Sequence, residues 1–282
     1  MSGPPTRLAD PRVARRWMRR VGFGTVLTAL VIWSANGTGT NPGLLVDEGA
    51  QERMGAFVSG FLHPDLSASY LAEVGSAMLS TFQISIVALI IGIAIAIPLA
   101  PFAASNLLVT RMPGLSLRRK AFAVVPYQIA RNLLNFMRAV PELIWALVFV
   151  TAVGLGPFAG ALAIGVHAGG LLGKLWAEQM EAVDDGPIEA IRLLGAGRFG
   201  TISLGVWPMA RQNILSLTLY QWECNLRAAT IVGFVGAGGI GQQLDVSIRL
   251  FQYSETATLI LALLLMVFMA DSFSTLIRRA VR

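Results

Sequence analysis

Five ionisable side chains lie within or beside long runs of apolar residues: Glu142, His167, Lys174, Glu223 and Arg227. A charge in such surroundings is costly, so its presence needs a reason. The guanidinium of Arg227 presents a planar fork of N–H donors that matches two oxygens of a phosphate or carboxylate. In the functional interpretation these five residues therefore lie along a polar path, and Arg227 offers its fork to a passing oxyanion.

A structural explanation competes with this one at each position. Glu223 and Arg227 are four residues apart and can neutralise one another on one helix face. Such pairing would offset part of a cost of about 2.5 to 3.5 kcal/mol per charge in the middle of a membrane span. His167 can be a satisfied interior group, Lys174 can extend its amine toward the interface, and Glu142 can lie at an interface near the start of its apolar run.

Gly165, Gly169 and Gly173 recur every fourth residue in the run that also contains His167 and Lys174. On a helix this spacing gives one face without side chains, which allows a neighbouring helix to approach closely. We therefore expect the glycine face to serve packing. His167 and Lys174 project from roughly the opposite face.

The stretch DDGPIEAIRLLGAGRFGTISLGVWP separates two apolar runs and contains the signals of a short, sharply ended helix. Asp184 or Asp185 can cap its N-terminus, and Gly195 can take the left-handed conformation that ends it. We expect a helix over 187–194, a bend, and a second short helix near residue 198. Such a rigid shape at a membrane surface is suited to docking into a groove of another protein. The residues assigned to this contact are Asp185, Gly186, Glu189, Ala190 and Gly195.

The run Gly236-Ala237-Gly238-Gly239-Ile240-Gly241 has the G-x-G-x-x-G spacing of a dinucleotide-binding loop. That fold needs repeated βαβ units, whereas the rest of this sequence supplies one further apolar run. The run is expected instead to bend the chain sharply near the outer mouth of a path, through Gly236, Gly238, Gly239 and Gly241. Gly173-Lys174-Leu175 lacks the hydroxyl residue and the earlier glycine of a P-loop, so we expect this chain to bind no ATP.

Composition places the chain in a membrane. Of its 282 residues 55% are hydrophobic and only 13% are charged, which could not give a normal soluble surface. One cysteine, Cys224, excludes a disulfide within the chain, and no Cys/His cluster has metal-ligand spacing, so no metal is expected. The net charge of +6 comes with basic residues beside apolar runs, which indicates membrane orientation rather than nucleic-acid binding.

Runs of apolar residues predict an all-α integral membrane protein with about six transmembrane helices. The expected spans are 21–35, 82–104, 139–155, 158–177, 214–235 and 257–277. The expected organisation is an Arg-rich N-terminus (1–20), a first transmembrane helix (21–36), an external loop (37–81) and a transmembrane domain (82–282). A cleaved secretory signal is disfavoured, because Ser34-Ala35-Asn36 is a poor cleavage site.

The external loop contains apolar residues at helical spacing, followed by His63-Pro64. They are Met54, Phe57, Val58, Phe61 and Leu62. This pattern predicts a helix that lies in the membrane interface or packs on the top of the bundle, and neither location needs a ligand. Both alternatives stay open from the sequence.

Orientation follows from the basic residues, which gather on the cytoplasmic side. Basic groups precede the first span, fill the connection after the second and follow the last: Arg7, Arg12, Arg15, Arg16, Arg19, Arg20; Arg111, Arg118, Arg119, Lys120, Arg131, Arg138; Arg278, Arg279, Arg282. The loop 37–81 carries mainly acidic residues and one Arg53, so we expect it outside. Six crossings then place both termini and the Glu189 segment in the cytoplasm.

Four blocks of the sequence resemble the phosphonate-type ABC transporter permeases: RAVPELIWALVFVTAVGLGPFAGALA, HAGGLLGKLWAE, DDGPIEAIRLLGAGR and NLRAATIVGFVGAGGIGQQL. The resemblance runs from about residue 82 onward, and the Glu189-Ala190 and Gly195 spacing is similar to the coupling loop of ABC importer permeases. Two departures occur: Ile191 stands where the pattern has a second alanine, and Gly205 and Trp207 replace aliphatic residues before a proline.

The resemblance implies a type I ABC importer permease fold with a cytoplasmic coupling helix in the inner membrane. It implies a permease pair, two ABC ATPase subunits that bind ATP and Mg, and an external substrate-binding protein. We expect the pair to be a homodimer, and the sequence leaves a heterodimer open. It further implies import of phosphonate or a related oxyanion such as phosphate or phosphite.

Two other functions are weighed against this one. An ion-coupled secondary transporter would also use intramembrane charges, but no inverted repeat is apparent. A membrane-bound enzyme is disfavoured because no nucleophile, base and orienting group occur at recognisable spacing. The sequence does not distinguish phosphonate from phosphate or phosphite.

Overall fold

The computed structural model describes residues 11–41, 43, 47–108 and 117–281, and in this part of the chain every regular element is helical. The chain divides into two compact units, Met1–Phe57 and Val58–Arg282. Three residues used to predict the orientation, Arg7, Arg111 and Arg282, lie outside the described residues.

The first unit contains helix α1 (Pro11–Gly37), which continues the expected span 21–35 into the Arg-rich segment before it. Its apolar side chains are exposed; Phe23 and Trp33, for example, are 72% and 76% exposed. A free helix of this composition in water would be unfavourable, so α1 is suited to a lipid or protein environment.

Helix α2 (Glu48–Leu62) begins in the first unit and ends in the second, and it contains the expected amphipathic helix. None of its residues is buried. Its C-terminal end lies beside the start of α12, because a side chain added at Gly60 would collide with Tyr253. This contact supports packing against the bundle at that end of α2.

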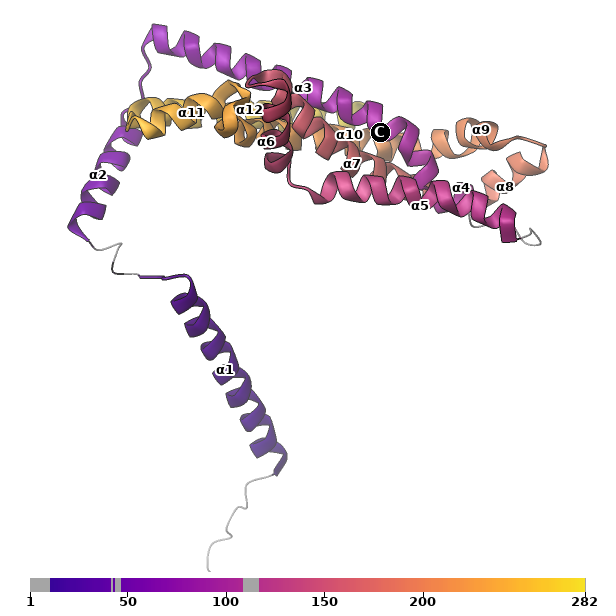
Figure 1. Cartoon of the computed structure of the whole chain (residues 1–282), viewed down its shortest axis with the longest axis horizontal. Coiled ribbons are helices and arrows are strands. Elements are labelled where there is room, and N and C mark those ends of the chain that lie inside the picture. The colour runs from indigo at the N-terminus through magenta and orange to yellow at the C-terminus, as the bar shows by residue number, and fades with distance from the viewer. Residues whose placement is uncertain (1–10, 42, 44–46, 109–116, 282) are drawn as a thin grey trace, which may run out of the picture. The chain divides into compact units, whose positions relative to one another are not determined.

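The second unit is a bundle of long helices joined by short ones (Figure 1). The long helices are α3 (Ala68–Ala103), α5 (Leu117–Ala139), α6 (Glu142–Val153), α7 (Pro157–Glu181), α10 (Trp207–Val232) and α12 (Tyr253–Val281). The short elements are α4 (Ser105–Leu108), α8 (Asp185–Leu193), α9 (Arg198–Gly200), η2 (Thr201–Val206), η3 (Gly233–Ala237) and α11 (Gly239–Arg249). Figure 1 shows α8 and α9 at one end of the bundle and α11 at the other.

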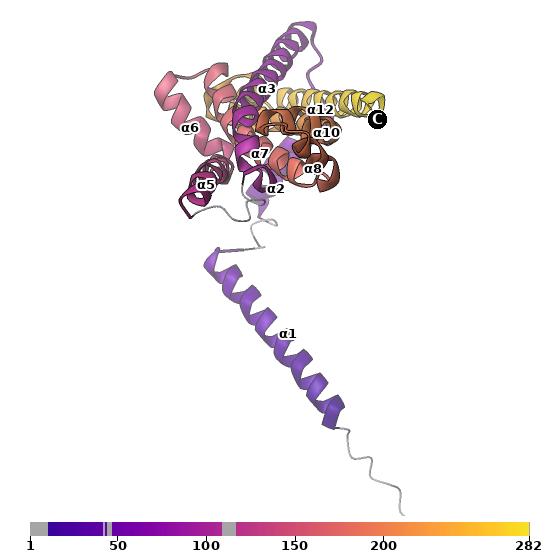
Figure 2. The same cartoon turned by 90° about the vertical axis from the view of Figure 1, so that its right-hand side faces the viewer.

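Helix α7 lies in the middle of the bundle, between α5 and α6 on one side and α12 on the other (Figure 2). Its glycine face is filled by neighbouring helices, as the sequence predicts. A Cβ atom added at Gly165 would come within 2.7 Å of Ile91 on α3, and one added at Gly169 within 2.8 Å of Ile95. The glycines therefore set the close approach of α7 to α3.

Within the described residues, three helices are long and apolar enough to cross a membrane: α3, α7 and α12. The segment expected to form a continuous span over 139–155 does not do so. Helix α5 ends at Ala139, Pro141 precedes α6, and the two helices meet at an angle of 89°. The reason is local, since the residue before a proline is disfavoured in helical conformation. Taken together, α5 and α6 are compatible with one broken span or a re-entrant loop.

Helix α3 begins at Ala68, well before the expected start near residue 82, so it includes part of the predicted external loop. Helices α1 and α10 are not among these three helices. Helix α10 carries several polar residues, which lower its mean hydropathy: Arg211, Gln212, Asn213, Gln221, Glu223, Asn225 and Arg227. Crossings by α1 and α10 stay predictions.

Candidate coupling and translocation sites

The predicted helix–bend segment is present as α8, with the capping residues that the sequence indicates. The Asp184 carboxylate accepts a hydrogen bond from the Gly186 N–H over 3.4 Å at the N-terminus. At the other end Gly195 has φ +87°, and its N–H donates to the Arg192 carbonyl over 2.9 Å. Only glycine takes this backbone conformation without strain, so the chain ends α8 abruptly and turns toward α9.

One face of α8 is fixed to the bundle. Ile188 is 2% exposed and belongs to a cluster with Leu172 and Met180 of α7. Ile191 lies against Gly205, where an added Cβ would be 3.1 Å from the isoleucine Cδ1. Ile191 is the residue that departs from the Ala of the coupling-loop pattern, and Gly205 also departs from that pattern. The two departures therefore complement one another in space.

The other face of the segment is apolar and exposed. Leu193, Leu194 and Phe199 are 84%, 88% and 83% exposed. Large apolar side chains gathered at one tip indicate a protein interaction surface. The sequence analysis did not assign these three residues to the docking surface. Their position shortly after the Glu189-Ala190 pair, in the segment expected to dock, could have indicated them.

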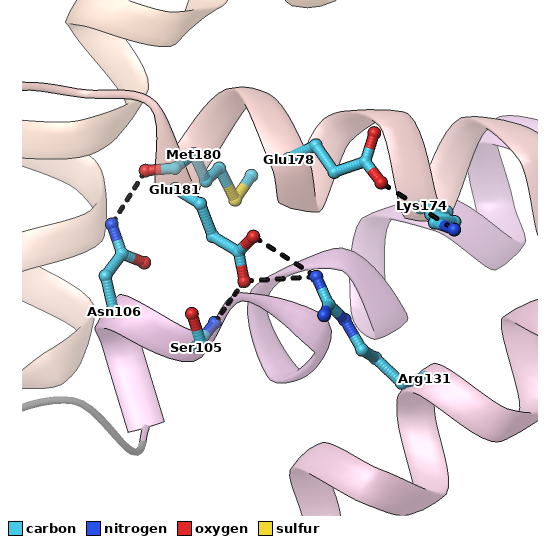
Figure 3. A network of polar contacts seen from close by, with 7 residues as sticks. All are labelled: Ser105, Asn106, Arg131, Lys174, Glu178, Met180 and Glu181. Atoms are coloured by element: carbon cyan, nitrogen blue, oxygen red, sulfur yellow. Dashed lines mark hydrogen bonds and ion pairs between the residues drawn. The ribbon is translucent and has the colours of Figure 1, made fainter.

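A polar network joins α4, α5 and the end of α7 (Figure 3). The Arg131 guanidinium contacts both Glu181 carboxylate oxygens, at 3.1 and 3.2 Å, and the Ser105 N–H donates to the same carboxylate over 2.6 Å. The Asn106 side chain donates to the Met180 carbonyl over 2.9 Å. Charge-assisted contacts of this kind are the stronger hydrogen bonds in proteins.

Helix α8 is also hydrogen-bonded to this network. Arg192 of α8 donates to the Asn106 carbonyl over 3.3 Å. A displacement of α8 would therefore pull directly on α4 through the Arg192–Asn106 contact. Asn106 also bonds to Met180, so the end of α7 would be displaced as well. The sequence did not reveal this network because Arg131 and Glu181 are 50 residues apart.

The predicted path residues fall into separate groups. Glu142 and His167 come together where α6 starts: the His167 Nε2 lies 3.8 Å from the Glu142 carboxylate, and its Nδ1 lies 3.0 Å from the Val140 carbonyl. Lys174 is 3.8 Å from Glu178, one turn further along α7, as Figure 3 also shows. His167 is thus satisfied by α5–α6 contacts, which agrees with the structural alternative for this residue.

Glu223 pairs with Arg278 of α12 rather than with Arg227. The Arg278 nitrogen lies 3.1 Å from the Glu223 carboxylate, and the two side chains are 23% and 12% exposed. Arg227 instead donates to the Cys224 sulfur over 3.4 Å and is exposed. The neutralisation of Glu223 expected within α10 is therefore provided by another helix, and Arg227 is left exposed.

Arg227 lines a cavity of about 450 Å³ between α10 and α12. Glu223 and Asp271 line the same cavity, together with apolar residues of α12 that include Phe268. Carboxylates near the guanidinium weaken its attraction for an anion. Weak attachment is compatible with transport, because a conducted ion must leave its site as well as enter it.

The Glu223–Arg278 pair predicts a specific pattern of stability. Glu223→Gln or Arg278→Met alone leaves one charged partner unmatched, which we expect to cost about 1.5 to 3 kcal/mol. The double variant removes both charges, so most of this loss should be recovered. The measurement is the thermal midpoint of the purified protein. A double variant no more stable than the worse single variant would exclude a structural pair.

The glycine run forms the turn between α10 and α11, as expected. Gly236, Gly238 and Gly239 have φ values of +88°, +83° and +69°. A Cβ at Gly241 would overlap the Thr230 carbonyl, and the Ile240 N–H donates to the buried Thr81 hydroxyl over 2.9 Å. The run thus brings α11 against α3 and α10, and no strand accompanies it in the described part of the chain.

The fold defines the class of protein first. A chain of the MetNI methionine ABC transporter, solved in inward-facing conformations, superposes with a TM-score of 0.64 at 21% identity and covers 77% of this chain and 100% of that chain. This likeness shows that the bundle has the architecture of a type I ABC importer permease.

The family follows from sequence comparison. Residues 114–282 match the model of the binding-protein-dependent transport system inner membrane component. This chain belongs to that family, and it is a phosphonate-type ABC transporter permease. The resemblance to ABC transporter permeases noted in the sequence is thereby confirmed.

Three relatives indicate the branch of the family. PtxC, a phosphite transport system permease protein of Stutzerimonas stutzeri, is 44% identical over 54% of this chain and 56% of its own length. HtxC, a putative phosphite transport system permease protein of the same organism, is 36% identical over 80% of this chain and 75% of its own. PhnE, a phosphate-import permease protein of Mycolicibacterium smegmatis, is 34% identical over 95% of this chain and 46% of its own. The matched part thus spans about half the length of PtxC and of PhnE.

Proposed function

We propose that this chain is the membrane-spanning subunit of an ATP-driven importer of phosphite, phosphate or a phosphonate. One observation carries the proposal: a capped helix with an exposed apolar tip is anchored in a permease bundle whose relatives are named for these phosphorus oxyanions. Arg227 supports this class of substrate, because guanidinium binds such oxyanions in a bidentate manner.

The proposed partners follow from the exposed surfaces. Two ABC ATPase subunits seat on the tips formed by Leu193, Leu194 and Phe199, and ATP and Mg are bound by those subunits. A second copy of this chain completes the transporter as a homodimer. An external binding protein delivers the substrate at the end of the bundle that contains the glycine turn.

The proposed mechanism uses the rigidity of α8. ATP binding closes the ATPase pair and draws the two docked segments together. Ile188 and the Arg192–Asn106 contact transmit this displacement to α7 and α4, so the spans tilt from inward-open to outward-open and receive substrate. Hydrolysis resets the inward-open state. The chain itself performs no chemical step.

Substrate uptake tests the proposal. Cells expressing the permease with its ATPase and binding protein should accumulate labelled phosphite, phosphate or methylphosphonate, and cells lacking only the permease should not. Accumulation of none of the three oxyanions, with the assembled complex present in the membrane, would contradict the proposed substrate class.

Orientation is a separate prediction, with the termini and α8 in the cytoplasm. In a Cys224→Ser background, an impermeant thiol reagent added to intact cells should label Ser59→Cys but not Ala182→Cys. Both positions are exposed in the described structure, so access differs only through the membrane. Ala182→Cys should become labelled after permeabilisation. Labelling of Ala182→Cys in sealed cells would reverse the topology.

A further inference from the structure

A groove of about 890 Å³ lies between the C-terminal end of α3 and the bend after α8. Its walls are mainly apolar, and we call it the α3–α8 groove. The residues that define its walls include Ile97, Phe102, Trp176, Phe199, Ile202 and Trp207. Its volume is within the range of sites that bind small organic ligands. The tip residues Leu193 and Leu194 do not line it, whereas Phe199 belongs both to the groove wall and to the docking surface proposed for the ATPase.

Polar groups gather on one part of the groove wall. Arg192 and Asn106 line it next to the network at the end of α7. Within the described residues, the buried Asn106 Oδ1 and the buried Trp176 Nε1 have no hydrogen-bond partner. Trp176 is only 5% exposed, so water does not readily satisfy its N–H. Neither atom is accessible from the groove, so the polar side chain that a ligand there can reach is the partly exposed Arg192.

The groove opens along a membrane span. Helix α3 meets the length and hydropathy criterion for a crossing, and its Ile97 and Phe102, near the end of that helix, are 59% and 49% exposed. In a bilayer, apolar walls along a span suit hydrocarbon chains, and a guanidinium beyond the end of that span suits the charged headgroups of lipids.

We propose that an anionic phospholipid occupies the α3–α8 groove. One acyl chain lies against Ile97 and Phe102, and the phosphate oxygens accept hydrogen bonds from the partly exposed Arg192 guanidinium. An apolar protein surface fits less well, because it would give the charged Arg192 guanidinium no anionic partner. The lipid connects the membrane span α3 to the coupling helix α8, independently of the transported substrate.

A groove-filling variant tests the proposal on the complete transporter. A Cβ at Gly197, which lines the groove, meets nothing within 4 Å, so Gly197→Leu adds a bulky apolar side chain at the groove wall without a clash at Cβ. Gly75→Leu is the matched control, because Gly75 is exposed on α3, away from the groove, and is equally free of neighbours. Native mass spectrometry with added phosphatidylglycerol should show one retained lipid per permease chain in wild type and Gly75→Leu, and none in Gly197→Leu.

A charge variant identifies the headgroup contact. Arg192→Gln should weaken phosphatidylglycerol binding by about tenfold or more, as expected for loss of a hydrogen bond to a charged group. Arg279→Gln removes an exposed arginine from the last turn of α12 and should bind lipid like wild type. Equal lipid retention by Gly197→Leu and Gly75→Leu would overturn the proposal. So would displacement of the lipid by inorganic phosphate, or a disulfide between two copies through Ala196→Cys.

Discussion

Gly195→Val is expected to abolish transport while the protein still inserts into the membrane. The bend at Gly195 has φ +87°, and nothing lies within 4 Å of an added Cβ. The effect is therefore one of backbone strain alone, about 1 to 2 kcal/mol for an ordinary residue and more for a β-branched one. A strained end frays α8 and misdirects Leu194 and Phe199, so copurified ATPase should fall together with uptake.

The matched control is Gly195→Asn at the same position. Asparagine tolerates the left-handed conformation far better than valine, so ATPase association and most of the uptake should be retained. Full uptake and normal ATPase association in Gly195→Val would show that this bend is not the coupling contact.

Arg227→Met should reduce uptake by about ten- to a hundredfold, the loss expected when one charged hydrogen-bond donor is removed from an oxyanion path. Expression and ATPase assembly should stay normal, because Glu223 is paired with Arg278 rather than with Arg227. This separates the effect from protein stability. Reduced uptake with intact assembly assigns Arg227 to the path.

The control for this variant is Arg249→Met. Arg249 is an exposed arginine at the end of α11 that is paired with Asp245 at 2.8 Å, outside the cavity of Arg227. Removing it changes the net charge of the chain by the same amount and should leave uptake near the wild-type value. Full uptake in Arg227→Met would remove this residue from the path.

The coupling helix was predictable because its signals are local. Asp184 caps α8 and Gly195 ends it, and both act through hydrogen bonds within a few residues. The glycine face of α7 was predictable for a similar reason, since a four-residue repeat is visible in the sequence. The sequence could not show which helices would fill that face.

The bend between α5 and α6 was missed because hydropathy continues through it. Apart from Glu142 and Thr151, the residues from Val140 to Val153 are apolar or proline, so a window average predicts one straight span. The conformational restriction before a proline decides the structure instead. The bend places Glu142 beside His167, a contact that the residue spacing alone does not reveal.

Ion pairs between distant segments of the chain also could not be predicted from the sequence. Spacing along one helix predicts Glu223 with Arg227, because only neighbours at four residues are visible in a sequence. Arg278 on α12 is the partner in the structure, and Arg131 pairs with Glu181 in the same long-range manner. Both pairs depend on which helices lie side by side, which no local pattern contains.

Uptake by the reconstituted transporter tests the central claim most directly. The permease, its ATPase and the binding protein are assembled in sealed liposomes with ATP on the ATPase side, and labelled phosphite, phosphate and methylphosphonate are supplied on the other. The account predicts accumulation of at least one of them against its gradient, and none when a hydrolysis-deficient ATPase replaces the active one. Accumulation that persists with the inactive ATPase and follows an ion gradient would contradict the account and indicate a secondary transporter.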